Sequence, residues 1–135
     1  MGESINWSDD PLQVYLSAVN EIPPLEKSEE TACIDHVRAG DDMADMARKR
    51  LVEANLHLVV SRAEPYRHGN IHILDLIEKG NAGLLLAVQS LVGHFPSSFS
   101  EYAIPLIERA LAEVSQPVRA SRLEGNGRFA PARWN

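Results

Sequence analysis

Two runs in the middle of the chain decide the fold: Arg50-Leu-Val-Glu-Ala-Asn-Leu-His-Leu-Val-Val60 and Leu74-Asp-Leu-Ile-Glu-Lys-Gly-Asn-Ala-Gly-Leu84. Their apolar residues recur with the spacing of one face of an α-helix rather than alternating as in a strand. In the second run, charged and amide side chains stand between the leucines. We therefore expect the first run to be part of a long helix and the second to be an amphipathic helix with one polar face.

Start and stop signals predict helices on both sides of these runs. Asp10-Pro11 combines an N-cap with proline at the first helical position, and Pro23-Pro24 ends that helix. Its apolar stripe consists of Leu12, Tyr15, Leu16 and Val19. The other expected helices run from Ser28 to Gly40, from Asp41 or Asp42 to about Ala63, from near Ile73 to about Leu91, and from Ser98 to about Val114. The fold class is therefore all-α, with about five helices.

Two features of the later helices carry structural expectations. Gly80 and Gly83 each cost roughly 1 kcal/mol in a helix interior, which indicates the close approach of another helix or a local irregularity. Ser98-Phe-Ser-Glu101 matches a capping box, and Pro105 is tolerable only in the first turn of that helix. We assign residues 1–8 to an N-terminal extension, 9–115 to the helical domain and 116–135 to an Arg-rich, flexible tail.

Composition limits the classes of function. The chain has 135 residues, a net charge of −6 and one cysteine, Cys33, so an intramolecular disulfide is excluded and a cytoplasmic location is expected. No signal peptide and no membrane-spanning run is found, which predicts no membrane partner. The negative charge opposes general binding to nucleic acid, although residues 116–135 carry a net charge of +3. That tail is either a non-specific DNA contact or a solvated terminus.

The sequence offers no catalytic constellation. The five histidines have no cysteine partners at zinc spacing, and Gly69-Asn70 between His68 and His72 argues against a shared helix face. Cys33 is expected to be a small buried side chain rather than a reactive thiol. We predict that the chain is not an enzyme and holds no metal or other cofactor.

The two central runs together resemble region 2 of the sigma-seventy (housekeeping-type) family of bacterial RNA polymerase sigma factors. Those factors carry a run similar to D-L-I-Q-E-G-N-I-G-L where this chain has Asp75–Leu84, and the separation from Arg50–Leu56 also resembles the family's. Upstream, Asp10–Leu16, Ile22-Pro23 and Leu25 resemble the opening of region 1.2. The similarity covers roughly residues 9–114, and no segment resembles regions 3 or 4.

The resemblance implies a protein partner, the clamp helices of the largest subunit of RNA polymerase core. The residues that would face them are Leu56, Asp75, Glu78, Lys79, Asn81 and Leu85. This chain has Glu78-Lys79 where the family commonly has Gln-Glu, so a charge is reversed in the middle of the expected contact. A misplaced charge there can cost several kcal/mol, which would weaken or retarget the contact.

The DNA-facing segment departs further from the family. The family has a basic and aromatic loop there, followed by a helix with a Trp pair that traps flipped bases of the −10 element by stacking. This chain has Val92–Ser98 without Lys or Arg, and Pro105-Leu106 in place of the Trp pair. Residues 92–115 carry a net charge of −2, which repels phosphates. Promoter DNA is therefore expected to be a weak partner.

The residues left for such a weak DNA contact are Phe99, Tyr102 and Arg109. Single aromatics near a helix start are also common in the core. Two functions remain open: a sigma-factor-like protein that binds RNA polymerase core with weakened or lost melting of the −10 element, and a sigma mimic that binds an anti-sigma or other regulatory protein. The sequence decides neither the target promoters nor the oligomeric state.

Overall fold

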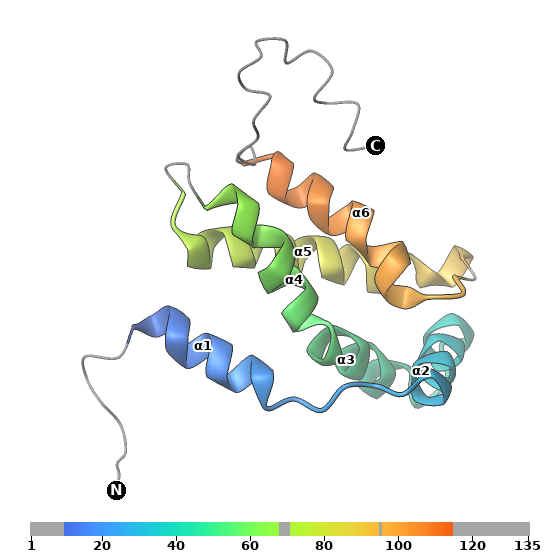
Figure 1. Ribbon diagram of the computed structural model, residues 1–135. Coiled ribbons are helices and arrows are strands. Elements are labelled where there is room, and N and C mark those ends of the chain that lie inside the picture. Colours follow the sequence, from blue (N-terminus) through green and yellow to red (C-terminus); the bar gives the residue numbers. More distant parts are fainter. Residues whose placement is uncertain (1–9, 68–70, 95, 115–135) are drawn as a thin grey trace, which may run out of the picture.

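The computed structural model describes residues 10–67, 71–94 and 96–114 (Figure 1). All regular structure within these ranges is helical, which confirms the all-α class. The α-helices are α1 Pro11–Asn20, α2 Lys27–Ala39, α3 Ala44–Ala54, α4 Leu56–Ala63, α5 Ile73–Gln89 and α6 Phe99–Ala112. Short 3-10 helices, η1 Glu64–Tyr66 and η2 Ser90–Gly93, follow α4 and α5. The extension 1–8 and the tail 116–135 lie outside the described residues.

Side chains cap the helices close to the predicted starts. Asp10 Oδ1 accepts a hydrogen bond from Leu12 N at 3.1 Å at the start of α1. Ser98 Oγ accepts one from Glu101 N at 3.3 Å at the start of α6. Helix α2 begins earlier than predicted, because Glu26 and Glu29 form the capping box there in place of a cap by Ser28.

The predicted third helix is wrong in one respect: it is two helices, α3 and α4, separated at Asn55. The backbone of Asn55 leaves the helical region, with φ −115° and ψ 10°. Its buried side-chain amide donates to Leu51 O at 2.8 Å, so a polar side chain closes the end of α3. No proline or glycine marks this break in the sequence.

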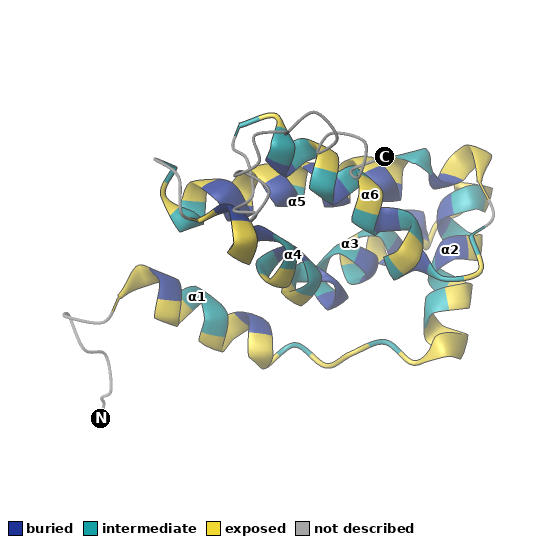
Figure 2. Cartoon of the chain, turned by 45° about the horizontal axis from the view of Figure 1, so that its top comes forward, coloured by how far each residue is buried: buried dark blue, intermediate teal, exposed yellow. Residues whose placement is uncertain are grey.

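Helix α5 lies at the centre of the fold, packed along α6 and crossed by α4 (Figure 1). Both glycines lie where another helix passes closely, as expected. A Cβ at Gly83 would lie 2.6 Å from Leu106 O of α6, and one at Gly80 would lie 2.6 Å from Val59 Cγ1 of α4. The buried faces of these helices point toward one another in Figure 2. The three helices therefore form one tightly packed core.

The N-terminal half lies along one side of this core (Figure 1). Helices α2 and α3 pack as a pair beyond one end of α4, and an extended connector of residues 21–26 joins α2 to α1 (Figure 1). Leu12 and Val19 of α1 are buried, while most of the connector is exposed (Figure 2). No helix in the described ranges combines the length and apolar content needed to cross a bilayer.

Pro105 does not lie in the first turn of α6, where a proline is tolerated. Pro105 is the seventh residue of the helix, beyond the first turn. It therefore cannot donate to the carbonyl of Glu101, the residue four positions earlier, and its ring crowds that carbonyl. Packing of Ile107 and Leu111, both fully buried, holds the helix together past this point.

Candidate functional site

One side of α5 remains open after the core has formed. Its exposed residues include Asp75, Glu78, Lys79 and Leu85, and we call these four the α5 face. At about 100° per residue, these four and Asn81 fall within about 160° of the helix circumference. The opposite side, with Leu76, Ile77 and Leu84 among others, is buried. The structure thus brings five of the six candidate protein-binding residues to one side of one helix.

The charged groups of the α5 face have no partner within the described part of the chain. None of the ion pairs there includes Asp75, Glu78 or Lys79. Asp75 lies in the first turn of α5, where the helix dipole favours a carboxylate. The carboxylates of Asp75 and Glu78 and the ammonium of Lys79, which pair with no other described residue, are thus available for ion pairs with a second molecule.

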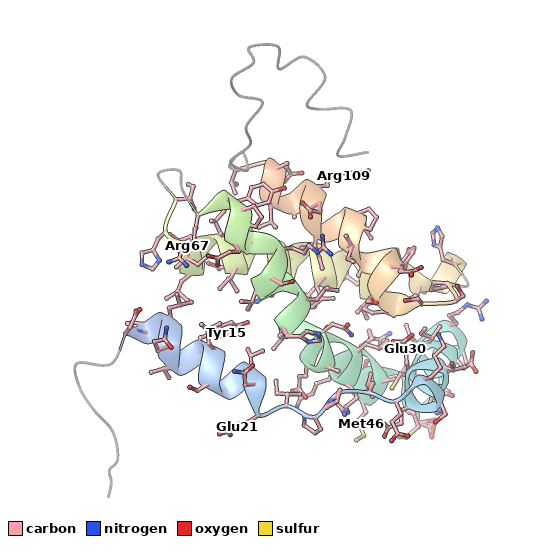
Figure 3. The ribbon with its side chains drawn as sticks, in the orientation of Figure 1. Tyr15, Glu21, Glu30, Met46, Arg67 and Arg109 are labelled. Carbon is pink, nitrogen blue, oxygen red and sulfur yellow. The ribbon has the colours of Figure 1, made fainter. Side chains whose placement is uncertain are left out.

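The two candidates that do not belong to the α5 face, Asn81 and Leu56, are half-buried. The amide Nδ2 of Asn81 donates to Tyr15 Oη of α1 at 3.4 Å, and its Oδ1 is buried without a hydrogen-bond partner. Asn81 therefore faces α1 at the edge of the α5 face (Tyr15 is labelled in Figure 3). Leu56 begins α4, one residue after the break at Asn55, and packs against the core.

Leu85 borders a hollow between α5 and α3. The hollow measures about 330 Å³, and its apolar lining includes Val52 and Val88. Leu85 itself is 47% exposed. An exposed leucine beside an apolar hollow offers a protein partner apolar surface to bury.

The aromatic candidates for DNA contact are placed differently from the expectation. Phe99 is fully buried, so its ring is not available to stack on a base in this structure. Tyr102 is half-buried and hydrogen-bonded through its hydroxyl to Ser90 Oγ, and its ring lies 5.3 Å from that of His94. Both aromatics therefore pack at the start of α6 in this structure, and a DNA contact through either of them stays a prediction.

Internal contacts also hold the segment before α6. Lys27 Nζ donates to Ser97 O, and Phe99 N donates to Glu30 Oε2 at 3.1 Å. These contacts tie the segment to the first turn of α2 (Glu30 is labelled in Figure 3). An exchange of these bonds would have to accompany any opening of this region.

The exposed negative charge of α6 is smaller than the net charge counted from its sequence indicates. Glu108 is only 17% exposed in its side chain, accepts a hydrogen bond from Tyr66 Oη at 2.7 Å and pairs with Arg62 at 3.5 Å. Its charge is therefore largely neutralised within the fold. Arg109, the remaining DNA candidate, is exposed near the end of α6 (Figure 3).

Cysteine and histidine form no metal centre in the described ranges, where no group of three or more His, Cys, Asp or Glu residues is placed to hold an ion. Burial raises the pKa of the Cys33 thiol, opposed by the Arg50 guanidinium. His72 caps α5, its Nδ1 accepting from Leu74 N at 3.1 Å, whereas His68 lies outside the described residues.

Sequence reasoning missed the part of the surface that α3 supplies. Arg48, Lys49 and Glu53 border the hollow beside Leu85, together with Val52. They alternate with the buried residues Ala47, Leu51 and Ala54 along α3. The helical spacing of these polar and apolar residues is visible in the sequence, but only the packed structure shows that α3 lies next to α5.

Comparison with known proteins places the chain in a family, although no protein-family model matches it. The chain is 37% identical over 115 residues to the RNA polymerase sigma factor SigA of Lactococcus lactis subsp. cremoris, covering 82% of this chain and 32% of that protein. It is 41% identical over 116 residues to the sigma factor RpoS of Coxiella burnetii, covering 83% and 32% respectively. SigA of Clostridium acetobutylicum is 38% identical over 115 residues, covering 82% and 30%. The chain spans about a third of the length of these relatives, and over that span it belongs to the sigma-seventy family of RNA polymerase sigma factors.

Proposed function

We propose that this protein binds RNA polymerase core through the α5 face and acts, without enzymatic activity, in transcription initiation. The observation that carries the proposal is the exposed set Asp75, Glu78 and Lys79, which forms no ion pair with another described residue, beside the exposed Leu85. Its relatives are RNA polymerase sigma factors, and the similarity extends across both central runs. Charged groups around an apolar anchor suit a partner that presents a pair of helices.

We further propose that this domain melts promoter DNA weakly or not at all. The support lies in α6 and the segment before it. Phe99 is buried, the Tyr102 hydroxyl is hydrogen-bonded to Ser90, and Pro105-Leu106 supplies no aromatic ring for stacking. Stacking of a base on an aromatic ring contributes roughly 1–3 kcal/mol per base. A domain whose aromatic rings are buried, bonded or missing at these positions therefore lacks a main source of the energy that opens DNA.

A competition assay separates binding to polymerase from melting. Labelled housekeeping sigma factor is bound to core polymerase without DNA, and this chain is titrated in. In a second reaction, core polymerase and this chain alone are mixed with promoter DNA. We expect displacement of the labelled factor without DNA, and no open promoter with it. Failure to displace at any concentration would overturn the binding proposal, and an open −10 element would overturn the second.

The alternative function is a sigma mimic that binds an anti-sigma or other regulatory protein. The reversed charge at Glu78-Lys79 favours it, because this pair lies in the middle of the α5 face. Co-purification with such a regulator, together with no affinity for core polymerase, would favour this function over the first.

A further inference from the structure

Exposed apolar side chains gather beside α3. Six large hydrophobic side chains are exposed in the described residues, and three of them (Met43, Met46 and Leu85) border α3. Met46 is 66% exposed and projects away from the helix (Figure 3). Apolar surface concentrated in one place and rimmed by polar groups is typical of an interaction site.

Two hollows lie on either side of α3. The first, of about 390 Å³, lies between α2 and α3, with Cys33, Met43 and Met46 in its lining. The second, of about 330 Å³, is the hollow beside Leu85. Lys49 and Glu53 border both. They therefore form a ridge between the hollows, with Lys49 Nζ 3.9 Å from Glu53 Oε2.

The borders of these hollows are basic although the chain is acidic. The charged residues that border the two hollows are three cations, Arg48, Lys49 and Arg50, and one anion, Glu53. With His36 neutral, their net charge is +2, whereas the net charge of the whole chain is −6. Arg48 pairs with Asp45 outside the hollows, and Arg50 donates to Pro23 O at 3.2 Å. The Lys49 side chain is 74% exposed and is the most accessible of these cations. Such a border attracts acidic groups on a partner.

We propose that α3 is the docking site for an amphipathic helix of another protein, with acidic residues flanking its apolar face. Apolar side chains three or four positions apart on that helix enter the two hollows, and its carboxylates lie against Lys49 and Arg48. Methionine suits this role because its unbranched, flexible side chain adapts to the shape of an incoming residue. This site is separate from the contact proposed for RNA polymerase except at Leu85.

Because Leu85 belongs both to the α3 docking site and to the α5 face, a helix bound at α3 affects the contact proposed for RNA polymerase. A helix seated in the hollow between α3 and α5 covers Leu85, so it competes with any partner that needs the α5 face. This consequence rests on the proposed function, whereas the docking site itself does not. The two are tested apart because the next experiment contains no polymerase.

A selection experiment tests the docking site directly. A displayed library of 16-residue helical peptides, randomised at all positions, is selected on the full chain. We expect enriched peptides with apolar residues at i, i+3 or i+4, and i+7 and with Asp or Glu beside them. Recovery of no binder, or of basic peptides, would overturn the proposal.

Point variants then locate the binding of the enriched peptide. Met46→Glu and Lys49→Glu should each weaken it by at least about tenfold, because one places a charge in an apolar hollow and the other repels the carboxylates. Val92→Glu is the matched control, since Val92 is 64% exposed and borders neither hollow. Circular dichroism checks that each variant is folded. Binding insensitive to both α3 substitutions, or equally sensitive to Val92→Glu, would contradict the assignment.

Methyl NMR gives a second, independent readout. In ¹³C-methyl-labelled methionine protein, the Met43 and Met46 signals should shift on addition of the enriched peptide. The chain has three methionines, so the spectrum assigns readily with one substitution each. Unshifted Met43 and Met46 signals in the presence of bound peptide would place the peptide elsewhere and overturn the proposal.

Discussion

At the scale of single residues, Gly83 carries the closest contact between two helices. A Cβ there would lie 2.6 Å from Leu106 O and 2.9 Å from Ile107 Cα, both backbone atoms that cannot move without shifting α6. Gly83→Ala should therefore lower the free energy of unfolding by about 1–3 kcal/mol, outweighing the roughly 1 kcal/mol gain in helix propensity. Urea denaturation measures it. Gly93→Ala, where nothing lies within 4 Å, is the control, and equal stability of both variants would refute the close contact.

Asp41 gives a prediction about pH. A hydrogen bond from His36, at 2.7 Å between Nδ1 and Oδ2, lowers the pKa of the Asp41 carboxyl, as does the backbone N–H of Met43. A carboxyl whose pKa is depressed by folding adds stability above its unfolded pKa and loses it as the pH falls through the folded value. Asp41→Asn should therefore lower the melting temperature at neutral pH, and the difference should shrink as the pH falls from about 4, near the unfolded pKa, through the lower pKa of the folded protein. A difference that persisted or grew in acid would contradict this linkage.

At the scale of elements, α6 contains an avoidable defect. Pro105 is exposed and lies in the helix interior, where it leaves the Glu101 carbonyl without its helical donor. Pro105→Ala should raise the stability by about 1–3 kcal/mol, up to the intrinsic cost of proline in a helix. Thermal unfolding measures this gain. A destabilised Pro105→Ala variant would mean that α6 depends on a bend at this position.

The helices themselves were predictable wherever a local signal was strong. The helix start at Asp10-Pro11 and the helix end at Gly40, with its left-handed φ of 65°, follow from cap chemistry that acts within a few residues. The break at Asn55 was not predictable, because asparagine is tolerated within helices and its bond to Leu51 O is favoured here by burial. Local pattern alone could not choose between a capped break and a continuous helix.

At the scale of the whole molecule, the sequence predicted the α5 face better than its surroundings. Helical period puts Asp75, Glu78 and Lys79 on the polar side of a helix, the family resemblance adds Leu85, and the structure leaves that side open. The neighbourhood depends on packing between distant segments, which no local pattern encodes. Hence the hollow beside α3, the contact of Asn81 with Tyr15 and the burial of Phe99 emerged only from the folded chain.

The most direct test of the central claim is the affinity of core RNA polymerase for the variant Asp75→Lys, measured without DNA against the unchanged chain. Reversal of this exposed charge, which pairs with no other described residue, should weaken the complex by at least about tenfold if the α5 face forms the contact. Glu101→Lys is the matched control, because it reverses an exposed first-turn charge on α6 with a similar helix-dipole cost. The account predicts a loss for Asp75→Lys alone, and equal affinity of Asp75→Lys and the unchanged chain would contradict it.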